Sequence, residues 1–190
     1  FDTLVGFRPT AEILRVLNGI DTPLAQSLAE DLHAAPGFRG IVRLIERLLT
    51  EEISAAEVEQ IVVCCRELVD QGINVKRAYI TAVEIADHYP DDVGVVISLT
   101  LNRLTLQPGE AAFLGTGIIH AHLRGMCLEV MAASDNVLRA GLTRNAKSVA
   151  RATGRPLCVA PATRYSLVSP ACSCVNRREE AMSGNRHRDS

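Results

Sequence analysis

The sequence predicts an α+β protein in which a helical bundle is followed by part of a β-barrel and then by a disordered basic tail. Apolar residues recur at helical spacing from Thr10 to about Asp87. After Pro90 the pattern changes to short apolar and β-branched runs separated by turn residues. We therefore expect a helical region at 1–88, a β region at 89–143 and a tail at 144–190.

About five short helices are expected in the first region. Thr22 and Pro23 offer a cap and a first turn for one helix. Ser54 and Glu57 form a capping-box pattern for another, and Pro90 stops the last. The faces expected to point inward are Ile13, Leu14 and Leu17; Leu24, Leu28 and Leu32; Ile41, Leu44, Ile45, Leu48 and Leu49; Val58, Ile61, Val62, Cys65 and Leu68; and Tyr79, Ile80, Val83 and Ala86.

The β region is predicted from alternation and from turn signals. Residues 99–104 alternate between two faces, whereas 93–97 fit either a helical turn or a strand. Turns are expected at 108–109, at 115–117 and at Gly125. Several short strands at this spacing are typical of a jelly-roll or cupin-type barrel.

The tail is predicted from composition. Arginines outnumber acidic residues after Arg144, and no apolar period continues beyond Ala160. Such a segment cannot bury enough apolar surface to order itself. The Cys172-Ser173-Cys174 motif has no second Cys/His pair nearby, so we interpret it as inert.

Overall composition excludes several classes of function. The chain has 190 residues, 47% hydrophobic content and a net charge of -2, as in an ordinary soluble globular protein. Aromatic residues make up 4% and Trp is absent, which argues against nucleic acid as a partner. No apolar run approaches the roughly 20 residues of a membrane-spanning helix. The cysteine spacing is not that of a secreted disulfide framework, so a cytoplasmic location is expected.

Potential metal chemistry lies on the β region. Side chains two residues apart on a strand point to the same face, so His120 and His122 are expected to point the same way. Glu129 and Arg139 follow at longer spacing. A lone strand histidine is more often a structural residue than a ligand, and Arg139 could simply pair with Asp135 or Glu129.

Several motifs in order resemble one enzyme family, the type I mannose-6-phosphate isomerases, over roughly residues 1–143. They are Phe1-Asp2-Thr3-Leu4 with Gly6-Phe7-Arg8-Pro9, Tyr89 to Val96, Leu101 to Ala111, His120-Ala121, Leu128 to Ala132, Ser134 to Arg139, and Gly141-Leu142-Thr143.

The resemblance implies zinc-dependent interconversion of mannose 6-phosphate and fructose 6-phosphate, with a sugar phosphate as the partner molecule. It implies His120 as one of four zinc ligands, the other three of which belong to an N-terminal region of the family that we expect this chain to lack. It implies Arg139 as a catalytic residue that stabilises developing negative charge. Glu129 is expected to be catalytic, as a base, or to orient Arg139 or a metal ligand. We expect His120 to be an inherited zinc position that is empty here.

The chain departs from the family pattern in places. Ile119 and His122 stand where the family has Pro and Tyr, and Asn145 stands where it has a phosphate-binding Lys, with Lys147 two positions late. His122 could form a two-histidine partial site, but its spacing to Glu129 exceeds the usual cupin metal motif. We therefore favour a pocket-lining role for His122.

We interpret the chain as a C-terminal fragment of such an isomerase, with little or no activity alone. The chain begins with Phe1 and departs from the family after Thr143, which is consistent with a truncated reading frame and an out-of-frame ending. Two alternatives stay open: a non-catalytic cupin-like binding or interaction module, and a pseudogene product that does not fold stably.

Overall fold

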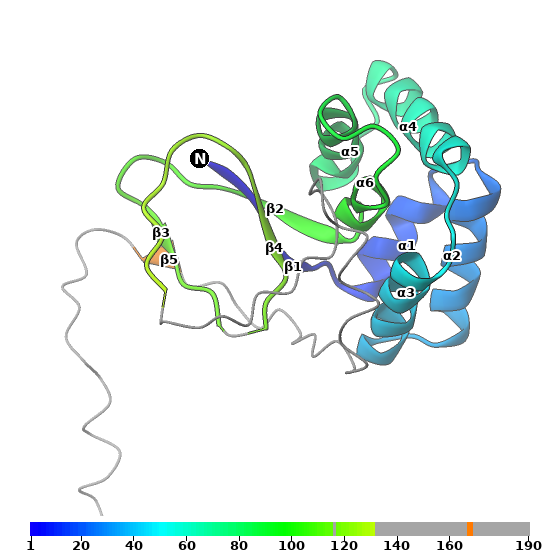
Figure 1. Ribbon diagram of the computed structural model, residues 1–190, viewed down its shortest axis with the longest axis horizontal. Helices are drawn as coiled ribbons and strands as arrows, with labels where there is room; N and C mark the ends of the chain where they lie inside the picture. The colour runs from blue at the N-terminus through cyan, green and yellow to red at the C-terminus, as the bar shows by residue number, and fades with distance from the viewer. Residues whose placement is uncertain (116, 132–166, 169–190) are drawn as a thin grey trace, which may run out of the picture.

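The computed structural model describes residues 1–115, 117–131 and 167–168. In this part of the chain the helices gather on one side and the strands extend away from them (Figure 1). The helices are α1 (Thr10–Asn18), α2 (Pro23–Ala34), α3 (Phe38–Thr50), α4 (Ala55–Asp70), the 3-10 turn η1 (Val75–Arg77), α5 (Ala78–Ala86) and α6 (Gly94–Ser98). The strands are β1 (Asp2–Phe7), β2 (Leu101–Thr105), β3 (Ala111–Ala112), β4 (His120–Arg124) and β5 (Leu167–Val168).

Capping hydrogen bonds mark the ends of several helices. The Thr22 hydroxyl accepts a hydrogen bond from the backbone N–H of Ala25 at the start of α2. The predicted capping box is present at α4, with both bonds between Ser54 and Glu57 formed. Helix α4 ends in a Schellman motif, in which Ile73 N–H donates to the Leu68 carbonyl. The five helices predicted before Pro90 are therefore confirmed.

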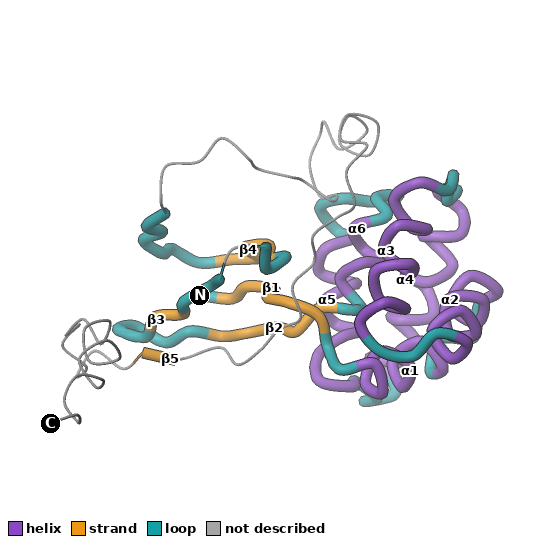
Figure 2. The backbone as a smooth tube through the Cα atoms, turned by 90° about the horizontal axis from the view of Figure 1, so that it is seen from below, coloured by secondary structure: helices purple, strands orange, loops and turns teal. Residues whose placement is uncertain are grey.

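The helices share one apolar core. Helix α1 packs on α2, α2 on α3, and α4 on α5, as Figure 2 shows from a second direction. Most residues predicted to point inward are buried, whereas Leu14, Leu49, Leu68 and Val83 pack at the margin and Ile80 is only half-buried. The ambiguous stretch 93–97 lies largely in the short helix α6, and the Asp92 carboxylate just before this helix accepts the N–H of Gly94 at 2.7 Å. No helix among the described residues is long and apolar enough to cross a membrane.

Strand β1 lies at the centre of a three-stranded antiparallel sheet with the order β2-β1-β4. The predicted helical region at 1–88 thus begins with a strand that the apolar pattern did not indicate, and every residue of this strand is buried. A β-bulge between Val5 and Phe7 places Gly6 at φ 57, a conformation that glycine adopts readily, and redirects the chain toward α1.

The predicted β region is only partly established. Strand β2 occupies most of the predicted alternating stretch, and the turn at Gly109 is present with φ 85. Strand β3 pairs with β5 in a separate two-stranded sheet, so the predicted tail contains a short strand. The remaining tail residues lie outside the described residues, and a closed cupin barrel stays a prediction.

Candidate metal centre

Strand β4 presents two histidines on one exposed face. It pairs with β1 so that His120 lies opposite Val5 and His122 opposite Thr3. Ala121 and Leu123, which alternate with the histidines, pack against the core. The two imidazole ring centres are 5.9 Å apart. The predicted orientation of His120 and His122 toward the same face is confirmed.

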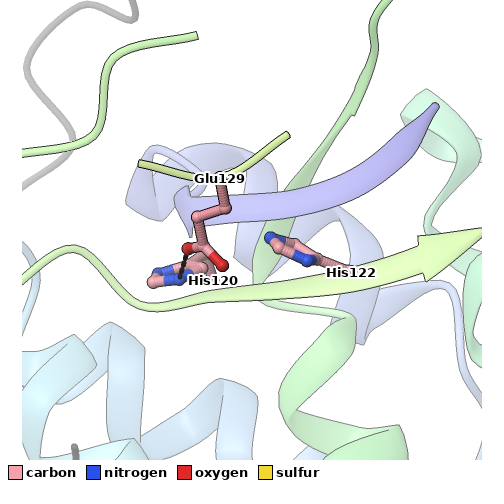
Figure 3. Close-up of side chains that lie close together, drawn as sticks. All are labelled: His120, His122 and Glu129. Atoms are coloured by element: carbon pink, nitrogen blue, oxygen red, sulfur yellow. Dashed lines mark ion pairs between the residues drawn. The ribbon is translucent and has the colours of Figure 1, made fainter. Parts of the chain in front are cut away.

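Glu129 reaches the same face from the segment that follows β4. The chain turns at Gly125, which has φ 98, and brings the Glu129 carboxylate over the histidines (Figure 3). Oε1 of Glu129 is 3.9 Å from Nε2 of His120, too far for a hydrogen bond. One potential ligand atom from each of His120, His122 and Glu129 lies within 4.8 Å of the others. The three potential ligands therefore converge, with a long ion pair and no hydrogen bond between His120 and Glu129.

The His120 ring is held in a defined tautomer. Its Nδ1 lies 2.9 Å from the carbonyl oxygen of Ile118. A carbonyl only accepts hydrogen bonds, so Nδ1 carries the proton and Nε2 keeps its lone pair when the ring is neutral. A backbone carbonyl is one of the usual partners of the second ring nitrogen of a metal-binding histidine.

These residues fit a zinc ion. Zinc binds histidine nitrogen and carboxylate oxygen at about 2.0–2.2 Å, which puts neighbouring ligand atoms roughly 3.3–3.6 Å apart in a tetrahedral site. Ligand atoms that lie up to 4.8 Å apart would therefore have to close by roughly 1 Å around the ion. Three protein ligands would leave one position open for water or a substrate oxygen.

The far end of β4 is fixed by an ionic cluster around Asp2. Arg124 Nε donates to Oδ2 of Asp2 at 2.8 Å, and the buried Arg103 donates to the same oxygen. Burial of Asp2 opposes its ionisation, but hydrogen bonds from Thr105, Arg103 and Arg124 outweigh that effect and hold the pKa of Asp2 well below its usual range. The cluster thus anchors the strand that carries both histidines.

A cavity of about 320 Å³ adjoins this cluster. Phe1, Asp2 and Arg124 are among its lining residues, and Phe1 also meets the His122 ring edge-on at a ring-centre distance of 5.2 Å. The polar side chains of Asp2 and Arg124 already bond to each other, and the cavity does not include the three metal-site residues. We therefore place the candidate site on the exposed face of β4.

The other residues predicted from the sequence are not all placed. Arg139 lies outside the described residues, as do Asp135, Asn145 and Lys147. The structure brings His120, His122 and Glu129 together. The sequence favours a pocket-lining role for His122 over a two-histidine partial site, and the signal for the latter is the His-x-His spacing on a strand.

Comparison with known proteins identifies close relatives. The chain is 34% identical over 158 residues to the mannose-6-phosphate isomerase of Homo sapiens, covering 75% of this chain and 37% of that protein. It is 34% identical over 156 residues to mannose-6-phosphate isomerase 1 of Arabidopsis thaliana, covering 75% and 35%. No protein-family model matches the chain.

Solved structures of mannose 6-phosphate isomerases are also similar to this chain. The apo form of mannose 6-phosphate isomerase from Salmonella typhimurium matches with a TM-score of 0.71 and 30% identity, over 92% of this chain and 43% of that one. A mannose 6-phosphate isomerase bound with zinc and yttrium matches with a TM-score of 0.64 and 32% identity, over 78% and 37%. The chain thus spans less than half the length of the relatives that it matches.

Proposed function

We propose, from the premise that this chain is homologous to part of the mannose-6-phosphate isomerases, that it is the corresponding part of a zinc-dependent aldose-ketose isomerase. The reaction is the interconversion of mannose 6-phosphate and fructose 6-phosphate. The proposal rests on the homology and on His120. The Nδ1 atom of His120 bonds to the Ile118 carbonyl, so its Nε2 has a lone pair available for a metal.

The site residues have distinct roles in this proposal. Zinc, when bound, would supply a redox-inert Lewis acid that polarises sugar oxygens. His120 would hold the ion through Nε2. Glu129 either moves a proton between C1 and C2 or orients its neighbours. Arg139, whose guanidinium stays charged, stabilises negative charge that develops on the sugar oxygens.

Substrate binding is expected to be weak in this chain. The resemblance implies a phosphate-binding lysine at the position of Asn145, and loss of a charged donor weakens phosphate binding. We infer a sugar phosphate as the partner molecule, with no nucleic acid or membrane. The cysteines among the described residues are free thiols, which supports a reducing, cytoplasmic location.

A chimera tests this activity. Residues 1–143 of this chain would replace the matching segment of the human relative, and isomerisation of mannose 6-phosphate would be assayed beside the purified chain alone. We expect little or no turnover by the chain alone and measurable turnover by the chimera. Arg139→Ala in the chimera is expected to abolish turnover. A folded, zinc-loaded chimera without activity would refute the proposal.

One observation favours a second candidate, a non-catalytic interaction module. Apolar side chains after β4 are 72% to 95% exposed, which is unusual for a free surface. They are Met126, Leu128, Val130 and Met131. Light scattering across a range of concentrations measures whether the chain self-associates. Self-association that is lost in a double variant, Leu128→Ser with Val130→Ser, would support the module.

A further inference from the structure

We propose that Arg124 is a positioning residue for Glu129. The bond between Arg124 and Asp2 fixes the direction in which the chain leaves β4, and that direction brings the Glu129 carboxylate over His120. The inference rests on the proposed function for the part that Glu129 plays in catalysis. The placement of Glu129 is a property of the folded chain itself, and a separate measurement tests it.

The first support is a β-bulge at the end of β4. Thr3 of β1 lies opposite His122. The preceding residue of β1, Asp2, lies opposite Arg124, so Leu123 is an extra residue on β4. Regular alternation would place Arg124 on the same face as His122. The bulge instead turns Arg124 toward Asp2, as bulges commonly do when they re-aim a side chain.

The second support is that Arg124 bonds to a fixed point. The side chain of Asp2 is 4% exposed and is held by the fully buried side chain of Arg103. Nε of Arg124 donates to Oδ2 of Asp2 at 2.8 Å, although the Arg124 side chain is itself 66% exposed. Hydrogen bonds between charged groups are shorter and stronger than neutral ones. The end of β4 is therefore tied to a carboxylate that the sheet holds in place.

The third support is the turn that follows at once. Gly125 has φ 98, and a Cβ on this residue would lie 3.0 Å from Cα of Phe1. The backbone at Gly125 therefore passes directly against the start of the chain, where the Phe1 ring also contacts His122 edge-on. Two successive residues at the exit of β4, Arg124 and Gly125, are thus held against residues 1–2.

The fourth support is that residues 126–131 have few other contacts to direct them. Within the described residues, no backbone hydrogen bond joins this segment to the rest of the chain. Met126, Leu128 and Val130 are 87% to 95% exposed. The approach of Glu129 to His120, at 3.9 Å, is too long for a hydrogen bond. The direction of the chain at the exit of β4 therefore determines where Glu129 lies.

NMR spectroscopy of the full chain tests this placement. An NOE between the His120 ring and the Glu129 side chain is expected in the unmodified chain, because Oε1 of Glu129 lies 3.9 Å from Nε2 of His120. Arg124→Gln removes an exposed guanidinium and leaves the buried bond between Asp2 and Arg103, so we expect the variant to fold. The NOE is expected to be lost in this variant.

Two further variants separate this placement from the general loss of an ion pair. Arg66→Gln breaks the pair that Arg66 of α4 forms with Asp87 at 2.6 Å, in which both side chains are about as exposed as Arg124. This control should keep the NOE. Arg124→Lys keeps a cation at the end of β4 and should also keep it.

Turnover of mannose 6-phosphate by the chimera tests the consequence for catalysis. Arg124→Gln in the chimera is expected to lower kcat by roughly 10-fold to 100-fold, since a displacement of about 1 Å can cost a factor of about 100. KM is expected to stay the same, because an interaction made only in the transition state lowers kcat and kcat/KM equally when it is lost. Arg66→Gln should change neither constant.

An NOE that persists in Arg124→Gln would overturn the proposal, as would its absence from the unmodified chain. Equal kcat values for the chimera with and without Arg124→Gln would also overturn it. If the unmodified chimera is inactive while the NOE follows the expected pattern, the proposed function falls and the placement of Glu129 by Arg124 stands.

Discussion

Nη2 of Arg103 donates to Oδ2 of Asp2 at 2.6 Å, joining β1 to β2. The side chain of Arg103 is fully buried, and that of Asp2 is 4% exposed. Because the same Asp2 oxygen accepts from Arg124 of β4 at 2.8 Å, one carboxylate links all three strands of the sheet. Removing it should affect both the stability of the sheet and the position of the histidines on β4.

Asp2→Asn is expected to lower the free energy of unfolding by about 3 kcal/mol at pH 7, near the low end for a broken buried pair. The substitution leaves Arg103 with Glu84 as its remaining acidic partner, at 2.5 Å. Urea unfolding of both proteins measures the difference. Asp70→Asn, at an exposed position of α4, is the matched control and should change stability by no more than about 0.5 kcal/mol.

The effect of Asp2→Asn is expected to depend on pH. The pKa of Asp2 is lowered in the folded state, so its contribution is fully present above the unfolded-state value of about 3.9 and is lost as the pH falls below that value. The stability difference between the two proteins should therefore shrink between pH 5 and pH 2. A difference that stays constant over this range would show that the carboxylate charge is not what stabilises the sheet.

Gly40→Ala is expected to destabilise the bundle by about 1–3 kcal/mol or more. A Cβ at Gly40 would lie 1.7 Å from the carbonyl oxygen of Ala35, a backbone atom that cannot rotate away. The intrinsic gain of roughly 1 kcal/mol for alanine in a helix is too small to compensate. Thermal unfolding tests this, with Gly115→Ala as the control because nothing lies within 4 Å of a Cβ there.

Ser54→Ala is expected to cost about 1 kcal/mol by removing the cap of α4. The Ser54 hydroxyl is the largest cause of the lowered pKa of Glu57, so that pKa should rise toward its ordinary value in the variant. Titration followed by NMR measures it. Ser54→Thr keeps the hydroxyl and should behave like the unmodified chain; an unchanged Glu57 titration in Ser54→Ala would contradict this assignment.

The helical part was predictable because its signals are local. Apolar spacing and the Ser54–Glu57 box depend only on residues three or four apart. Strand β1 was missed because Asp2 and Gly6 are residue types depleted in strands. Asp2 is accommodated by Arg103 and Arg124, partners about a hundred residues away that no local pattern identifies.

The candidate site was predictable in part for the same reason. The shared face of His120 and His122 follows from strand alternation alone. The approach of Glu129 depends on the reversal at Gly125, so its distance from the histidines could not be estimated from sequence spacing. The long spacing to Glu129 favours a pocket-lining role for His122, whereas the folded chain places its ring beside His120 and Glu129.

Zinc is expected to stabilise the folded chain if the three donors bind it. At 100 times the dissociation constant, a ligand that binds only the folded state adds about 2.7 kcal/mol to the free energy of unfolding. Urea unfolding with zinc and with a chelator measures this gain, and magnesium serves as the control ion because it prefers oxygen ligands. In His122→Phe the gain should fall below about 1 kcal/mol. Because β4 pairs directly with β1, the gain should appear in the unfolding of the sheet. An equal gain in the unmodified chain and in His122→Phe would assign the zinc to other residues.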